Sequence, residues 1–335
     1  MPQRNSTRVF NSGRGRVLSL ALVVLTAASQ HEPARAAYPE KPVTLIVPFA
    51  AGGANNAIAR IIAQELTAVL GQSVVVDNRA GAGGALGSDM VAKSAPDGYT
   101  ILIASSAHAI NPSVHTQMPF NTLTDFAPVM QLTKEAPYVV IVGEAQPIRN
   151  IKDVIALAKT KSGAVSYASS GNGGAPHLAG ALLGHMAGVE LTHVPYKGGG
   201  PALVDVMRGE VTLYFASLTT ALPQIKAGKV RAIAVSSASR SSHLPNVPTI
   251  VESGVPGFVI ASWYGILAPA KTPQPIVDQL NAALTKVMAS PAIQTRLAEQ
   301  GEEANTGTPD AFNRYIAAET VKFAKIVEVA RIPRE

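Results

Sequence analysis

The sequence predicts an α/β protein of two domains, each a mainly parallel sheet covered by helices. The chain has 335 residues, of which 47% are apolar and only 15% charged, so it can bury more than one core. Short β-branched runs alternate with amphipathic segments of helical spacing along most of its length. Continuous apolar strands separated by helices are typical of parallel sheets that are covered on both faces.

The first series of βα units begins with the strand Val43–Val47. Apolar residues at helical spacing follow it from Ile58 to Leu70, which predicts a helix. A second strand at 74–76 precedes a helix near residues 86–91. A third strand at 101–103 precedes Ser105 and Ser106. Together these segments predict the first sheet.

A second series of strands follows Pro137, and the last part of the chain is helical. The predicted strands are 138–142, 165–168, 191–194, 211–215 and 230–235, and the predicted C-terminal helices are 276–287, 293–297 and a segment opened by Pro309. We expect one domain from residues 37–137 and 263–335 and the other from residues 138–262. Crossings near 128–142 and 258–267 would form a hinge.

The N-terminal segment 1–36 has the pattern of a signal peptide. Four arginines and no acidic residue precede an apolar run from Val17 to Ala28, and Ala34-Arg35-Ala36 fits a cleavage site. Because the arginines lack an adjacent pair, the sequence favours the general secretory route and a mature chain that begins at Ala37 or Tyr38. The predicted location is the periplasm.

Charge and cysteine content exclude several classes of function. Without its leader the chain has a net charge of +2 rather than +6, and no basic block remains, which argues against nucleic acid as a partner. The chain has no cysteine, so disulfides and thiolate metal sites are impossible. The seven histidines show no metal-ligand spacing. We therefore expect no metal and no cofactor, and we expect a monomer.

Three loops rich in glycine, serine or asparagine follow predicted strands and precede predicted helices: residues 48–56, 81–84 and 169–174. A helix N-terminus offers unpaired N–H groups and the positive end of the helix dipole, so it can hold an anion without a cationic side chain. A single loop of this kind is more often a turn and a helix cap. Three of them at strand ends favour a site for a carboxylate or a phosphate.

Other chemistry finds little support in the residues. Leu86 stands where a dinucleotide fingerprint needs its third glycine, and no phosphate-binding P-loop or Gly-x-Ser-x-Gly elbow occurs. Lys197 could balance an anion, although a single loop lysine is usually solvated. Trp263, the one tryptophan, could line a cleft or pack at the hinge. No set of nucleophile, base and orienting residue can be named, so we expect no enzymatic activity.

Long strings in the body resemble a known family. The strings are PFAAGGANNAIAR, GQSVVVDNRAGAGGALGSDMVAKSAPDGYT, YASSGNGGAPHLAG, HVPYKGGGPAL and SWYGILAPAKTP. They resemble the solute receptors of tripartite tricarboxylate transporters, also called Bug receptors, from about Tyr38 to the C-terminus. The resemblance implies a type II periplasmic-binding-protein (Venus-flytrap) fold, whose two lobes close on a carboxylated solute and deliver it to a membrane permease.

The resemblance also assigns binding residues to four segments. It implies a first loop that binds a carboxylate through backbone groups, a contribution from the loop after the third strand, and two contributions from the facing lobe. The residues are Phe49, Ala51, Gly53, Ala54 and Asn55, then Ser105 and Ser106, then Ser170, Gly171 and Asn172, then Ala216 and Ser217.

Two departures from the family pattern narrow the expected solute. Relatives often carry Asp where this chain has Asn56, and Asp or Asn near Ala216 and Ser217. A cleft without these acids would suit a di- or tricarboxylate or an aromatic acid rather than an amino acid. The alternative role is a sensor that feeds a signalling partner through the same closure.

Overall fold

Two separate β-sheets organise the chain from Lys41 onward, which forms one structural unit. The computed structural model describes residues 1–3, 5–9, 38–161 and 163–334. Most of the predicted signal peptide 1–36 lies outside the described residues. Within the described ranges, no helix has the length and apolar character needed to cross a membrane.

The first sheet has five strands in the order β2-β1-β3-β11-β4. Strand β1 pairs in parallel with β2 and β3, whereas β11 is antiparallel to β3 and β4. The strands are β1 (Val43–Val47), β2 (Val74–Asn78), β3 (Thr100–Ser105), β4 (Phe126–Gln131) and β11 (Tyr264–Pro269).

The second sheet has six strands in the order β10-β5-β8-β6-β7, with β9 also beside β5. Strand β6 is parallel to β7 and β8, and β5 is antiparallel to β8, β9 and β10. The strands are β5 (Ala136–Gly143), β6 (Ser166–Ser169), β7 (Thr192–Pro195), β8 (Leu213–Ser217), β9 (Val230–Val235) and β10 (Ala261–Ser262).

The α/β class and the two sheets are confirmed, and the pairing adds a detail. Strands of consecutive βα units pair in parallel, as expected, because a helix between them carries the chain back to the same edge. The strands next to the crossings, β5 and β11, run antiparallel to their neighbours, since the chain enters the sheet there from the opposite end. Both sheets are therefore mixed and not mainly parallel as expected, and the second has more antiparallel than parallel pairs.

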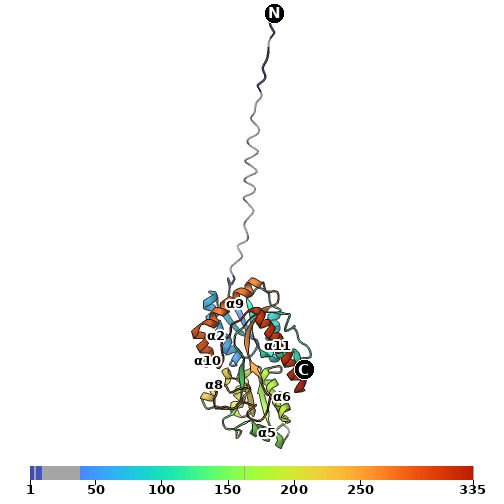
Figure 1. Cartoon of the computed structure of the whole chain (residues 1–335), viewed down its shortest axis with the longest axis vertical. Coiled ribbons are helices and arrows are strands. Elements are labelled where there is room, and N and C mark those ends of the chain that lie inside the picture. The colour runs from blue at the N-terminus through green and yellow to red at the C-terminus, as the bar shows by residue number, and fades with distance from the viewer. Residues whose placement is uncertain (4, 10–37, 162, 335) are drawn as a thin grey trace. The chain divides into compact units, whose positions relative to one another are not determined.

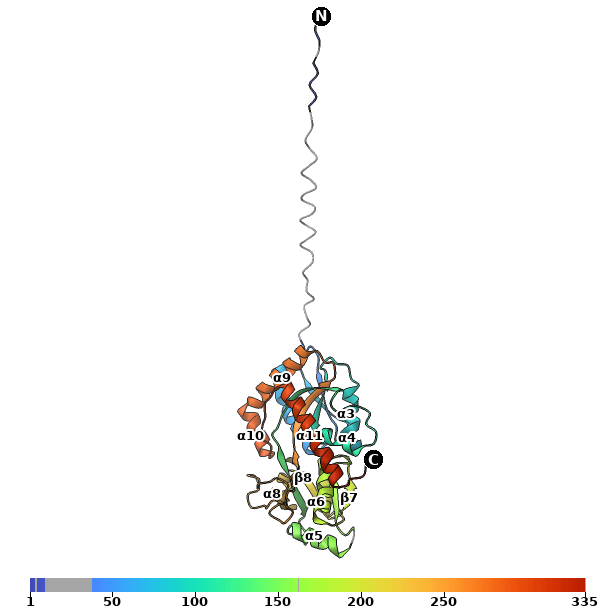
Figure 2. The same ribbon diagram turned by 45° about the vertical axis from the view of Figure 1, so that its right-hand side comes forward.

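Each sheet has its own set of helices (Figure 1; Figure 2). Around the first sheet lie α2 (Ala54–Leu70), the short 3₁₀ helix η1 (Ala82–Gly84), α3 (Ala85–Ala92), α4 (Ser106–Val114), α9 (Gln274–Ala289), α10 (Pro291–Glu299) and α11 (Pro309–Val329). The second sheet carries α5 (Ile151–Thr160), α6 (Ala175–Ala187), α7 (Gly199–Arg208) and α8 (Leu218–Lys226).

The chain passes between the sheets at two short links. Residues 132–135 join β4 to β5, and Trp263 alone joins β10 to β11. Both links fall within the segments predicted to cross between domains. A hinge motion at these links is still a prediction.

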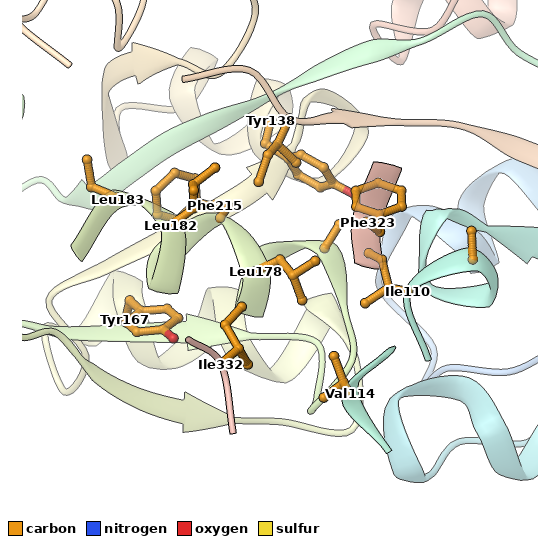
Figure 3. Packing of buried hydrophobic residues seen from close by; sticks show 14 of the residues in the cluster. Ile110, Val114, Tyr138, Tyr167, Leu178, Leu182, Leu183, Phe215, Phe323 and Ile332 are labelled. Carbon is orange, nitrogen blue, oxygen red and sulfur yellow. The ribbon is translucent and has the colours of Figure 1, made fainter. Parts of the chain in front are cut away.

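An apolar cluster connects helices of the two sheets (Figure 3). Ile110 and Val114 of α4 and Phe323 of α11 belong to the same buried cluster as Leu178 and Leu182 of α6. Because α4 and α11 cover the first sheet and α6 the second, any separation of the sheets either pivots near this cluster or exposes it to water.

Trp263, at the second link, is packed in the protein interior and does not line a cleft. Its side chain is fully buried, stacks edge-on against Phe312 and Tyr315, and donates its indole N–H to Oε2 of Glu319 at 3.0 Å. Of the two roles considered for this residue, the structure supports packing at the crossing.

Replacing Trp263 with phenylalanine should therefore destabilise the fold. The change removes the donor to the buried Glu319 carboxylate and leaves a void, and we expect a loss of about 2–4 kcal/mol in the free energy of unfolding. Urea unfolding of the wild type and of Trp263→Phe measures this loss. Solute affinity should stay within about twofold, and a large loss of affinity without loss of stability would place Trp263 in the binding site instead.

Candidate functional site

The N-termini of five helices meet at a cavity between the two sheets. Helices α2 and α4 reach it from the first sheet, and α6, α7 and α8 reach it from the second. Its lining residues are Phe49, Gly53, Ala54, Asn55, Ser105, Ser106, Ala107, Tyr138, Ser170, Ala175, Pro176, Gly199, Tyr214, Ser217, Thr220 and Tyr264. Two of the three predicted loops, 48–56 and 169–174, contribute to this cavity, and the N-termini of α4, α7 and α8 join them.

The N-termini of these helices have few side chains that could satisfy their main-chain N–H groups. None of the five helices has an acidic residue in its first turn. Four of them, α2, α4, α6 and α7, have no side-chain hydrogen bond at the N-cap. Unpaired N–H groups and the positive ends of the helix dipoles therefore face the cavity, which favours an anion there.

Apart from the amide of Asn55, hydroxyl groups supply the polar side chains of the cavity wall. The hydroxyls of Ser106 and Tyr138 lie 3.2 Å apart. Burial raises the pKa values of Tyr138, Tyr214 and Tyr264 well above their ordinary value. These tyrosines therefore keep their protons and can donate hydrogen bonds to an anionic guest.

No lining residue of this cavity is Asp, Glu, Lys, Arg or His. An anion in it would be held by main-chain N–H groups and neutral hydroxyls, which is a known way to compensate a carboxylate for its lost hydration. An ammonium group would meet no carboxylate among these residues, and its burial would be costly.

The two sides of the cavity touch each other at its mouth. The main-chain N–H of Ala50 donates to the carbonyl of Lys197 at 2.9 Å. A Cβ atom at Gly53 would lie 3.2 Å from the nitrogen of Gly199, and one at Gly83 would lie 1.7 Å from the carbonyl oxygen of Asn172. The approach at Gly83 leaves no room for a side chain, and the approach at Gly53 is tighter than an ordinary van der Waals contact.

The enclosed space is small. About 40 Å³ is open to water-sized molecules, within about 470 Å³ that includes the mouth. A volume of about 40 Å³ holds a few waters.

A second, larger hollow of about 810 Å³ lies outside this mouth. It shares Phe49 and Ser170 with the inner cavity and is lined by the 81–84 loop and by Lys197. Lys197 is therefore at the entrance and does not line the inner cavity.

The structure brings most of the predicted site residues together. Phe49, Gly53, Ala54, Asn55, Ser105, Ser106, Ser170 and Ser217 line the inner cavity. Gly171 and Asn172 line the outer hollow instead.

Two predicted residues line neither space. Ala51 lies at the exposed tip of its loop. Ala216 is fully buried in the core of the second sheet.

The three tyrosines of the cavity wall were not predicted as site residues from the sequence. Tyr138 is the third residue of β5 after the first link, Tyr264 begins β11 after the second link, and Tyr214 lies in β8. Their positions within the predicted crossing segments were the available signal for Tyr138 and Tyr264.

Three of the seven histidines, His108, His177 and His193, pack against other rings. His108 lies against Phe120 and Phe126, and burial lowers its pKa to about 4. His177 and His193 stack with their ring centres 4.0 Å apart. Among the described residues, no group of three or more His, Cys, Asp or Glu side chains could hold a metal ion.

Comparison with known families decides the class of this site. The model of the tripartite tricarboxylate transporter family receptor matches residues 58–331. The chain belongs to this receptor family. The resemblance seen in the sequence is confirmed, and so is binding rather than catalysis, because the family is one of solute receptors.

Relatives of the receptor are similar over almost their whole length. A UPF0065 protein encoded in the tcbD-tcbE intergenic region of a Pseudomonas species is 40% identical over 323 residues, which cover 96% of each chain. Protein BugT of Bordetella pertussis is 36% identical over 315 residues, which cover 93% of this chain and 96% of BugT.

Solved structures share the receptor's fold. The periplasmic binding protein BugD superposes with a TM-score of 0.85 at 36% identity, over 89% of this chain and 100% of BugD. An R. palustris protein with adipate gives the same values. MatC from Rhodopseudomonas palustris with bound malate gives a TM-score of 0.83 at 31% identity, over 87% of this chain and 100% of MatC.

Proposed function

We propose that this receptor captures a small carboxylate without an ammonium group in the cavity between its sheets. One observation carries the proposal: five helix N-termini with no acidic first turn surround a cavity whose lining has no charged side chain. Such a site compensates an anion for its lost hydration, whereas a cation would find no carboxylate among the lining residues. Di- or tricarboxylates and aromatic acids are the solutes that fit.

Two solved relatives support the solute class. One carries adipate and the other malate, and both are dicarboxylates without an ammonium group. The similarity to them extends over most of this chain. We place the carboxylate at the N-termini of α2 and α4 on one side and of α6, α7 and α8 on the other.

Closure and delivery complete the proposed role. Residues 37–137 with 263–335 form one lobe and residues 138–262 the other, and the two links act as a hinge. The solute favours the closed form only through contacts to both lobes. We propose that segment 1–36 directs export to the periplasm and that the closed receptor, as a monomer, passes its solute to permease subunits of a tripartite transporter.

A thermal-shift screen tests the proposed solute class. The compounds are adipate, malate, citrate and benzoate, with aspartate and glutamate as amino-acid counterparts. A solute at one hundred times its dissociation constant should raise the unfolding temperature by about 5–10 °C, because it binds only the folded protein. We expect this shift for at least one acid of the first group. A larger shift with aspartate or glutamate would contradict the proposal.

A further inference from the structure

Glu302 is a buried acid at the contact between the two lobes. It lies between α10 and α11, with only 2% of its surface exposed. The segment around it is fixed to the first link: the N–H of Lys134 donates to the carbonyl of Glu303 at 2.9 Å, and the N–H of Asn305 donates to the carbonyl of Leu132 at 2.8 Å.

The side chain of Glu302 reaches the opposite lobe. Its Oε1 accepts a hydrogen bond of 3.0 Å from the hydroxyl of Thr219, in the first turn of α8. Gly301 brings the backbone close to the same helix, since a Cβ there would lie 2.5 Å from Cβ of Leu218. The burial of Glu302 therefore depends on α8 staying in its present place.

The surroundings of Glu302 do not suit a negative charge. Its second oxygen, Oε2, is buried and has no hydrogen-bond partner of good geometry. The hydroxyls of Thr219 and Thr133 offset burial only in part, and the pKa of Glu302 rises to about 8 from its ordinary 4.5.

The neighbours that titrate are tyrosines of the cavity wall. A charge on Glu302 would act on Tyr264 of β11 and Tyr138 of β5 and raise their pKa values further. Within the described ranges no lysine, arginine or histidine forms an ion pair with Glu302, and Lys134 pairs with the exposed Glu303 instead.

We infer that Glu302 is a proton-binding site of the receptor, occupied when α8 packs against it in the closed form and vacated when the lobes separate. The inference rests on the proposed function, because it concerns the same closure. Capture of an anionic solute would then be accompanied by the uptake of a proton. This proton would offset one unit of the negative charge that the solute adds to the receptor.

The sign of the pH dependence follows from this coupling. If opening returns Glu302 to water, its pKa falls to the ordinary 4.5, whereas it is about 8 in the closed form. Closure is then favoured fully below the lower value and loses this contribution as pH rises through the higher one. Between these values, each closure binds close to one proton.

Calorimetry with adipate, or with malate if it gives the larger thermal shift, tests the inference. Titrations of the wild type at pH 7 in two buffers of different ionisation enthalpy give the number of protons bound. We expect close to one proton per solute and, between pH 6.5 and 8.5, a fall in affinity of about 20-fold. Glu302→Gln should change by less than about twofold over the same range. Glu303→Gln, a control at the exposed neighbour, should keep the wild-type profile.

The outcomes separate this inference from the proposed function. Tight binding with no proton uptake, or the same pH profile in the wild type and Glu302→Gln, overturns the proton site and leaves the solute class standing. If Glu302→Gln does not fold, the proton count on the wild type decides alone. Failure of every screened acid to bind contradicts both proposals.

Discussion

Gly83→Ala should lose at least about 100-fold in solute affinity, because the added methyl group prevents the lobes from closing. The new Cβ atom would lie 1.7 Å from the carbonyl oxygen of Asn172 on the opposite lobe. That atom is main chain and cannot rotate away. The variant should therefore be held open, and the population of the closed, binding-competent form should fall. Calorimetric titration with adipate or malate measures the loss.

Gly71→Ala is the matched control for this variant. Both glycines have positive φ, +59° at Gly83 and +69° at Gly71, but a Cβ at Gly71 would meet nothing within 4 Å. The two variants share the backbone strain, about 1 kcal/mol, and differ in the clash between lobes. Equal affinities in Gly83→Ala and Gly71→Ala would show that the contact between Gly83 and Asn172 has no part in binding.

Ser170→Asp should weaken binding about 100-fold by placing a fixed negative charge where the solute carboxylate is expected. Ser170 lines the cavity just before α6, so an introduced carboxylate would itself satisfy the open helix N-terminus. Repulsion between two charges about 5 Å apart is about 3 kcal/mol at an effective dielectric constant of 20. That energy corresponds to a loss of about 100-fold in affinity.

The control is Ser170→Asn, which has nearly the same shape as aspartate and no charge. Any loss that comes from bulk alone is shared by both variants, so the ratio of their affinities isolates the charge. We expect this ratio to be about 100, and to shrink as the pH falls toward the pKa of the new carboxyl group. A ratio near one would mean that the solute binds away from Ser170.

Local patterns in the sequence were sufficient to predict most of the strands and helices. The bounds of β1 and β9 match the predicted Val43–Val47 and Val230–Val235, because each is a mostly apolar run rich in β-branched residues. Strand β4 was not predicted as a strand, since Pro128 and Gln131 interrupt its apolar pattern. Its pairing with β11 is a tertiary contact that no local pattern records.

The site was predictable where backbone chemistry defines it and less so where tertiary contacts do. Glycine and serine at strand ends pointed to helix N-termini, and loops 48–56 and 169–174 do line the inner cavity, whereas loop 81–84 lines the outer hollow. Tyr214 is an ordinary strand residue in the sequence, and only the register of β8 turns it to the cavity. Glu302 has the sequence context of an exposed loop residue, and its burial comes from the approach of α8.

The most direct test of the account is a crystal structure of the receptor with a bound dicarboxylate. We predict a carboxylate in the inner cavity whose oxygens accept hydrogen bonds from main-chain N–H groups of residues 53–55 and from the facing lobe, with no side-chain cation in contact. A carboxylate paired with the side chain of Lys197 in the outer hollow, with the inner cavity empty of solute, would contradict the account.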